Sequence, residues 1–314
     1  MEEFIHSLPK AELHVHLEGS VELSTLREIQ PDLDEEAARR AYGFEDFSSF
    51  LKGFAWVASQ LRRPEDYGLA ARRLLESLER QNVRYVEVTL SAGVVLWRGQ
   101  DLVAVHEALR EATRDSSVEC WWIWDAVRQW DFSLAERVVC LAAERAGDGV
   151  IAFGLGGDEE RGSALRFEPL FSYARRHGLR CVCHAGELTG PRSIWEALEV
   201  GAERIGHGLA CVEDEGLLRY LAASQTPLEI CISSNYRTGA ILRYGHHPLR
   251  RILDAGVCVT LNTDDPALFQ CTLESEYRAA LDLGVSRQQL EMLAANAFRH
   301  AFRTRASGFE VCGS

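Results

Sequence analysis

The nine residues from Glu12 to Ser20 read E-L-H-V-H-L-E-G-S and place His14 and His16 two positions apart in an apolar run. In an extended strand, side chains at positions i and i+2 point to the same face, about 7 Å apart along the strand. Two imidazole nitrogens on one face can therefore reach a single cation at about 2.0–2.1 Å each. Gly19 then allows the chain to turn away sharply. We predict a strand that presents two metal ligands at its C-terminal end.

An H-x-H pattern alone also fits two ordinary, half-buried histidines. Short motifs of this kind often occur by chance, so the pattern does not establish a metal site by itself. The metal hypothesis depends on whether other segments of the chain supply further ligands at equivalent positions.

Composition and charge narrow the class of protein. The chain has 314 residues, of which 46% are hydrophobic and 26% charged, as is usual for a globular protein. Its net charge of −13 argues against a nucleic-acid partner or an anionic membrane surface, because phosphate binding depends on an excess of Lys and Arg. No segment reaches the ~20 apolar residues of a membrane span, and the N-terminus is acidic rather than signal-like. We therefore expect a cytoplasmic protein whose nine cysteines stay reduced.

From residue 83 onward, strand-like apolar runs alternate with helical segments. Several of these runs are apolar throughout, as expected of strands that are covered on both faces. With the strand around His14 they make eight, and eight alternating units over about 300 residues are typical of a (β/α)8 TIM barrel. We expect one domain over residues 1–314, because no linker rich in Pro, Gly or Ser interrupts the chain. The later strands are expected at residues 83–90, 118–127, 150–155, 179–184, 204–207, 228–233 and 257–262.

Residues 21–82 are expected to form a helical insertion after the first strand. An apolar stripe at three- and four-residue steps predicts an amphipathic helix, and Pro64 opens the next one. The stripe fits packing against the barrel, and it also fits a lid over a flat aromatic ligand; one stripe can do both. Its members are Phe44, Phe47, Leu51, Phe54, Val57 and Leu61.

Helix ends are predicted from capping residues. Ser133 is the expected N-cap of a helix over residues 133–145, and Ser286 with Gln289 fits a capping box for the last helix. Residues 306–314 are expected to fray.

Barrel enzymes keep their chemistry at the C-terminal ends of the strands, and the polar residues of this sequence gather there. Imidazoles and carboxylates at several strand ends favour a metal site, because buried charges need partners or a metal. Three histidines and one aspartate suit Zn²⁺ better than iron or manganese. Lys10 precedes the first strand end and Lys52 lies in the insertion, so neither can bridge two metals and we expect one Zn²⁺ per chain. The strand-end residues are His14, His16, Gly156, Gly157, His184, Glu187, His207, Ser233, Ser234, Asn235, Asp264 and Asp265.

Two of these residues are candidates for proton handling. A metal lowers the pKa of a bound water toward 7, which supplies a nucleophile, and His207 is the strand-end histidine left to orient it. Glu187, three residues beyond His184, can serve as an acid, because a carboxyl in an enclosed site can stay protonated near neutral pH. The simpler interpretations are a glutamate that binds backbone N–H groups and a histidine in the core.

Six runs of sequence, in the same order along nearly the whole chain, resemble the adenosine deaminase family of the amidohydrolases. They are P-K-A-E-L-H-V-H-L-E-G-S from Pro9, G-G-D-E from Gly156, H-A-G-E from His184, R-I-G-H-G from Arg204, S-S-N-Y-R-T-G-A from Ser233 and L-N-T-D-D-P from Leu261. The resemblance implies hydrolytic deamination at C6 of an adenine-containing nucleoside, with release of ammonia. It also implies that Zn²⁺ is held by His14, His16, His184 and Asp264.

The same resemblance implies roles for the remaining residues. Glu187 would protonate the purine N1 and His207 would orient the attacking hydroxide. Asp265 would bind on the N7 side of the ring, and the backbone N–H of Gly157 would meet N3. The implied substrate contacts are His16, Glu18, Gly157 and Asp265.

Three departures from the family pattern bear on the substrate. Glu18 stands where many relatives have Asp near the sugar, Gly154 stands where relatives often have Asp, and Ser91-Ala92-Gly93 replaces the usual Ser-Pro. These positions surround the nucleoside tail and leave the chemistry at C6 untouched. The expected substrate is adenosine or an adenosine-like compound such as 6-amino-6-deoxyfutalosine, with adenine or an N6-substituted adenine as the alternative.

Other classes predict different features. A second deaminase type binds zinc through H-x-E and P-C-x-x-C, and the latter is absent from this sequence. A metal- or nucleoside-binding scaffold or sensor would be free to lose Glu187 or His207, yet both are present. A ring-amide hydrolase would prefer two metals.

Overall fold

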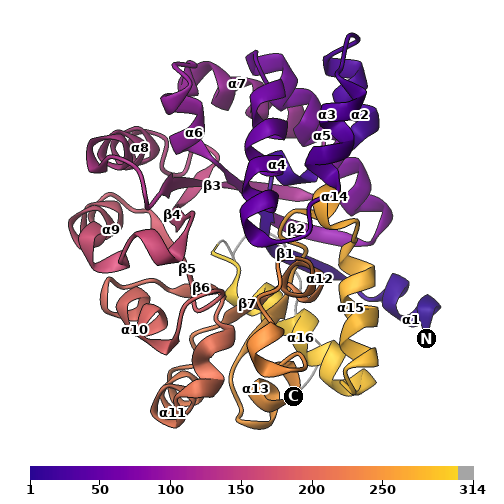
Figure 1. Cartoon of the computed structure of the whole chain (residues 1–314), viewed down its shortest axis with the longest axis vertical. Helices are drawn as coiled ribbons and strands as arrows, with labels where there is room; N and C mark the ends of the chain where they lie inside the picture. The colour runs from indigo at the N-terminus through magenta and orange to yellow at the C-terminus, as the bar shows by residue number, and fades with distance from the viewer. Residues whose placement is uncertain (303–314) are drawn as a thin grey trace.

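The computed structural model describes residues 1–302, in which eight parallel strands form one sheet in the order β1 to β8. The strands bend into a nearly closed barrel (Figure 1), so the predicted (β/α)8 TIM barrel is confirmed. The predicted fraying of residues 306–314 falls outside the described residues. The strands are β1 Lys10–His16, β2 Val83–Leu90, β3 Glu119–Val127, β4 Val150–Gly156, β5 Arg180–Ala185, β6 Arg204–His207, β7 Leu228–Ile230 and β8 Val259–Leu261.

The barrel closes where the segment after β8 meets β1. The backbone N–H of His16 donates to the carbonyl of Asp264 at 2.7 Å, and the N–H of Asp264 donates to the carbonyl of His14 at 3.0 Å. These bonds join Asp264 to His14 and His16, all three predicted metal ligands, through the main chain.

Helices cover the outside of the strands (Figure 1). The strands are rich in β-branched and aromatic residues that pack against these helices; Trp122 and Trp124 of β3, for example, are buried. Within residues 1–302, no helix combines the length and apolar character needed to span a membrane. After the insertion, the helices are α6 Ala92–Trp97, α7 Leu102–Thr113, α8 Phe132–Glu144, α9 Glu168–Arg176, α10 Pro191–Glu199, α11 Glu215–Ser224, α12 Ile232–Arg237, α13 Leu249–Asp254, α14 Pro266–Phe269, α15 Leu273–Asp282 and α16 Arg287–His300.

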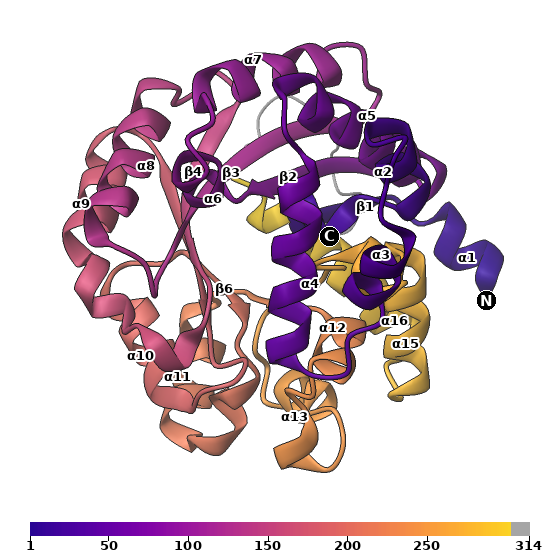
Figure 2. The same ribbon diagram turned by 45° about the horizontal axis from the view of Figure 1, so that its top comes forward.

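The insertion between β1 and β2 is helical, as predicted. It holds α2 Leu23–Ile29, α3 Glu35–Tyr42, α4 Phe47–Gln60 and α5 Pro64–Arg80, whereas α1 Glu2–Ser7 precedes the barrel. In Figure 2, α4 lies in front of the ring of strands. The amphipathic helix of the prediction therefore stands over the barrel; its movement as a lid stays a prediction.

Several boundaries differ from the prediction for local reasons. The expected strand over 228–233 ends at Ile230, because residues 232–237 form α12. The carboxylate of Glu276 accepts from the backbone N–H of Ser233 at 3.2 Å and satisfies a free group at the start of this helix. Ser133 is not the N-cap of α8; Asp131 is, and its side chain accepts from the N–H of Ser133. The Ser286 capping box of α16 is confirmed.

Candidate active site

Three predicted metal-binding histidines and one aspartate converge at the C-terminal end of the barrel. His14 and His16 come from β1, His184 from β5 and Asp264 from the segment after β8. One donor atom from each lies within 4.8 Å of the others. The Nε2 atoms of His16 and His184 are 3.2 Å apart, and Asp264 Oδ1 is 3.4 Å from Nε2 of His14 and of His16.

These separations fit a divalent metal. Tetrahedral bonds of about 2.0–2.1 Å imply donor atoms about 3.4 Å apart. Nε2 of His14 is also buried without a hydrogen-bond partner among the described residues, which is costly unless a cation or proton occupies that position. Although burial lowers the pKa of His14, the nearby carboxylates of Asp264 and Glu229 outweigh it and raise the pKa to about 10. The local field thus favours positive charge between these ligands.

Close packing holds the ligands in place. The ring of His14 lies over Gly206, where a Cβ would come within 2.8 Å of the His14 Cε1 atom. Asp264 has a φ of +65°, a strained value for a residue with a side chain, and its Oδ2 accepts from the Ser234 hydroxyl at 2.7 Å. Such strain is tolerated at functional sites that the surrounding structure over-determines.

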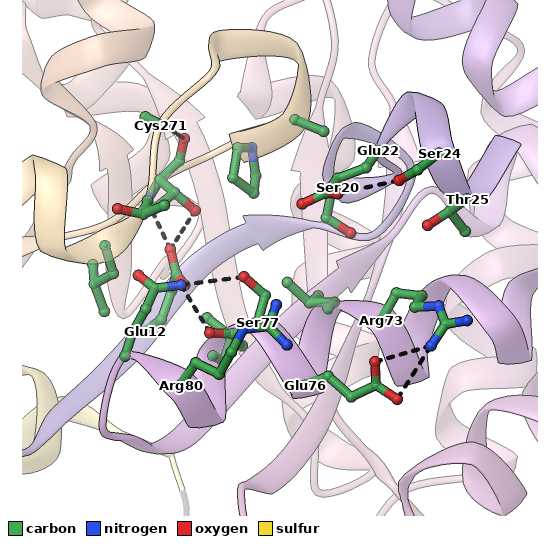
Figure 3. Close-up of a pocket in the computed structure, with 18 of the residues that line it drawn as sticks. Glu12, Ser20, Glu22, Ser24, Thr25, Arg73, Glu76, Ser77, Arg80 and Cys271 are labelled. Atoms are coloured by element: carbon green, nitrogen blue, oxygen red, sulfur yellow. Dashed lines mark hydrogen bonds and ion pairs between the residues drawn. The ribbon is translucent and has the colours of Figure 1, made fainter.

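The residue before Asp264 is tied to β1 from outside the barrel. Oε1 of Glu12 accepts from the backbone N–H of Thr263 at 2.7 Å and from its hydroxyl at 2.5 Å. Glu12 borders a second cavity of about 130 Å³, in which Glu12 and Cys271 lie close together (Figure 3). Arg73 and Glu76 pair with each other along its other side. Most polar side chains around this cavity pair with one another. The hydrogen bonds from Glu12 to Thr263 support the loop that carries Asp264.

A series of buried charged residues holds the ring of His14 through its Nδ1 atom. Nδ1 of His14 donates to Oε2 of Glu229 at 2.8 Å, and Oε1 of Glu229 accepts from Nε of Arg204 at 2.5 Å. Arg204 also binds Glu87 at 2.5 Å, and all three charged residues are at most 2% exposed. A neutral imidazole that donates through Nδ1 presents its Nε2 lone pair to a metal.

No sequence motif predicted this series of charged residues. The available signal was a charged residue inside each of three apolar strands, V-E-V, R-I-G and L-E-I, where burial demands a partner. Nothing local in the sequence shows which partner each residue takes.

Glu187 and His207 face each other beside the metal ligands. Oε2 of Glu187 is 3.7 Å from Nε2 of His207, which is 4.0 Å from Oδ2 of Asp264. Burial raises the pKa of Glu187 well above its usual value, and the charges of Asp264 and Glu159 raise it further. These shifts favour the protonated form of the Glu187 carboxyl, and its role as the acid stays a prediction. Burial also lowers the pKa of His207 to about 4, which keeps its imidazole neutral.

A cavity of about 320 Å³ brings most of the predicted site together. Asp265 is 2% exposed, with Oδ1 unpaired among the described residues, and burial followed by the charge of Asp264 raises its pKa well above the usual value. Gly19 is needed for close approach rather than for a turn, because a Cβ there would overlap the Asp265 carboxyl. The predicted site residues that line the cavity are His16, Gly157, His184, Glu187, His207, Asp264 and Asp265.

Glu18 is the predicted substrate contact that lies behind the cavity wall. Its carboxylate accepts from the backbone N–H of Ser91 at 3.1 Å, and Ser91 in turn lines the cavity. Burial raises the pKa of Glu18 to about 7. Its role toward a substrate stays a prediction.

The site can be compared with known proteins. The family described as adenosine deaminase matches residues 9–308. The chain belongs to the adenosine deaminase family. Among its relatives is the aminodeoxyfutalosine deaminase of Streptomyces avermitilis, 38% identical over 95% of this chain and 88% of that protein.

Solved structures of other deaminases share the barrel. Adenine deaminase from Arthrobacter aurescens superimposes with a TM-score of 0.87 at 32% identity, covering 96% of this chain and 95% of that one. Arabidopsis N6-mAMP deaminase gives a TM-score of 0.85 at 27% identity, with 96% and 95% covered. The protein is therefore an enzyme, a hydrolase of the deaminase type, rather than a scaffold or sensor.

The support for His14 generates a test. In Glu229→Gln, an amide replaces one carboxylate oxygen, so Arg204 and His14 can no longer both find an acceptor and the negative charge is lost. We expect metal affinity to fall about 10–100-fold, as for other residues that orient metal-binding histidines. Competition with a chelator of known affinity measures this.

The exposed pair partner Glu76 provides a matched control, since Glu76→Gln removes a carboxylate far from the metal ligands. Glu229→Asp keeps the charge and is expected to lie between wild type and Glu229→Gln. Equal metal affinities in all three variants and wild type would contradict the proposed support.

Proposed function

We propose that this enzyme catalyses zinc-dependent hydrolytic deamination at C6 of an adenine-containing nucleoside, with release of ammonia. The observation that carries the proposal is the convergence of a three-histidine, one-aspartate donor set with the buried carboxyl of Glu187 at one cavity. In this proposal His14, His16, His184 and Asp264 hold one Zn²⁺, Glu187 donates a proton and His207 orients the attacking oxygen. His16, Glu18, Gly157 and Asp265 contact the substrate.

Each of the protein's own groups has a separate role in the proposed reaction. When bound, zinc lowers the pKa of water so that a nucleophile exists at neutral pH. Glu187 donates its proton to the purine N1, which makes C6 more electrophilic. The carboxyl of Asp265, whose pKa is raised by burial, hydrogen-bonds on the N7 side of the ring, and the backbone N–H of Gly157 meets N3. Enclosure of the site strengthens each of these interactions because bulk water is excluded.

The outer part of the cavity bears on the identity of the substrate. With the purine at the metal end, groups attached to the ring extend toward a wall made by α4 and α6. This wall is aromatic and aliphatic, and it includes Trp97 and Trp130, whose ring centroids lie 5.3 Å apart. Its members are Phe47, Phe50, Leu51, Phe54, Ala55, Val94, Trp97 and Trp130.

The positive charge in the outer cavity is already hydrogen-bonded to backbone carbonyls. Arg98 is the one Arg or Lys among the described residues that line the cavity. Its guanidinium donates to the carbonyls of Ala58, Ser59 and Leu61 at the end of α4, the latter two at 2.8 and 2.9 Å. Among the described residues that line the cavity, none is therefore an unpaired Lys or Arg that could bind a phosphate. We propose an adenosine with an apolar, aryl-bearing tail, such as 6-amino-6-deoxyfutalosine, as the preferred substrate; adenine is the alternative.

Replacement of the acid tests the proposed chemistry. Glu187→Gln removes the proton donor but preserves shape, so kcat for ammonia release is expected to fall about 10²–10⁴-fold. Metal analysis should still find one zinc per chain. Glu168→Gln on the surface helix α9 serves as control and should keep wild-type activity. An active Glu187→Gln would remove the proposed acid, and two metals per chain would favour ring-amide hydrolysis.

A substrate series tests the tail. Ammonia release is measured with adenine, adenosine, AMP and 6-amino-6-deoxyfutalosine. We expect kcat/KM to be about tenfold or more higher for the aryl-bearing compound than for adenosine, because its ring is buried against an apolar wall, and lower for AMP, whose phosphate would be desolvated without a partner.

The Trp97→Ala variant should lose the advantage of the aryl compound while adenosine is processed as before. A preference for AMP over adenosine would overturn the assignment of the tail. A preference for adenine over all nucleosides would favour the alternative substrate.

A further inference from the structure

A series of buried hydrogen bonds leads from a backbone N–H to the catalytic side of His207. The N–H of Leu249, at the start of α13, donates to Nδ1 of His247 at 3.1 Å. Nε2 of His247 lies 3.2 Å from Oδ1 of Asn235, and Nδ2 of Asn235 lies 3.2 Å from Nδ1 of His207. His207, Asn235 and His247 are all at most 2% exposed. Neither His247 nor the amide of Asn235 has a part in the proposed chemistry.

The direction of every bond in this series follows from its first donor. A backbone N–H can only donate, so Nδ1 of His247 accepts and its proton sits on Nε2. That proton can only go to the amide oxygen of Asn235, which turns the NH₂ group toward His207. Nδ1 of His207 is then an acceptor, and the neutral ring carries its proton on Nε2.

The opposite arrangement is excluded by repulsion between donors. If the amide of Asn235 were reversed, its NH₂ group would face the Nε2 proton of His247. Moving that proton to Nδ1 would place it against the N–H of Leu249. Burial lowers the pKa of His247 to about 4, so this ring is neutral and has one proton to place.

On the other side of His207, Nε2 points into the cavity. Its separations of 3.7 Å from Glu187 Oε2 and 4.0 Å from Asp264 Oδ2 are too long for direct hydrogen bonds and suit an oxygen atom held between the groups. The strained backbone of His207, with φ of +61°, aims the ring at this point.

We propose that Asn235 and His247 are positioning residues that hold the proton of His207 on Nε2, so that His207 meets the attacking oxygen as a hydrogen-bond donor. Its role in catalysis rests on the proposed deamination, whereas the position of the proton does not. Nε2 then has no lone pair with which to take a proton from water.

Under this proposal, Glu187 both donates the first proton and takes one back from the attacking water. Glu187 gives its proton to N1 and becomes a carboxylate within reach of the attacking oxygen. As the C6–O bond forms, one proton of the water restores the Glu187 carboxyl. The second proton moves from the new hydroxyl to the amino group, the C6–N bond breaks, and ammonia leaves a C6 carbonyl with N1 protonated.

The position of the proton can be read by ¹⁵N NMR of the zinc-loaded protein labelled at histidine, with His207 assigned through His207→Gln. We expect a protonated Nε2 and an unprotonated Nδ1. In Asn235→Asp the carboxylate accepts from both neighbours, so Nδ1 of His207 should become protonated, and kcat should fall about 10²-fold with little change in KM. A protonated Nδ1 in the wild-type protein, or an Asn235→Asp variant with unchanged spectrum and kcat, would overturn the proposal.

Variants at His247 separate positioning from folding. His247→Gln retains a donor toward Asn235 and should keep both the spectrum and most of kcat, whereas His247→Leu should lose them. His106→Leu removes an equally buried histidine far from the cavity and controls for packing, with thermal unfolding and zinc content measured throughout. An equal loss of kcat in the two Leu variants would refute positioning. If none of the adenosine-like compounds is deaminated, the proposed function fails, yet the spectra still decide the proton position.

Discussion

Two backbone hydrogen bonds between Asp264 and the end of β1 are the constraint on which the site depends. They join the last strand of the barrel to the first and, in doing so, place Asp264 beside His14 and His16. Residues separated by about 250 positions in the chain thus become neighbours through the main chain, and side-chain rotamers need only complete the arrangement. The strained φ of Asp264 is maintained because these bonds, the Ser234 hydroxyl and the Glu12 tether to Thr263 all act on the same short segment.

Electrostatics inside the barrel reinforce that geometry. Glu87, Arg204 and Glu229 place one positive and two negative charges where no water reaches. Arg204 pairs with both carboxylates but neutralises only one charge, and the remaining negative charge acts through His14 on the proposed metal site. A buried ion pair adds little to stability by itself, since desolvation offsets the attraction. Its value here lies in orientation, because a carboxylate fixed on both sides leaves the imidazole one way to point.

Much of this architecture could be predicted from the sequence. Apolar runs gave seven strands to within about three residues, and the polar residues at their ends gave the four proposed metal ligands, Glu187 and His207. Contacts across the barrel could not be predicted in the same way. Glu229 is one acid in a short apolar run, and its partner His14 lies 215 positions away.

Other features depended equally on distant residues. Helix α12 begins where it does because Glu276 of α15 satisfies its first N–H groups, which no local propensity records. The role of Asn235 likewise depends on a histidine twelve positions further along the chain, whose direction is fixed by a main-chain donor. Periodicity reports which face of an element is buried; it does not report which buried polar groups meet.

The division of the cavity between two kinds of element has a consequence for evolution. The proposed metal ligands and proton donor come from the C-terminal ends of the strands and the segments after them, whereas the outer wall comes mainly from α4 and α6. Side chains along α4 can change size and shape without moving any strand end. Drift in these two helices can therefore reshape the outer cavity while selection preserves the residues at the strand ends.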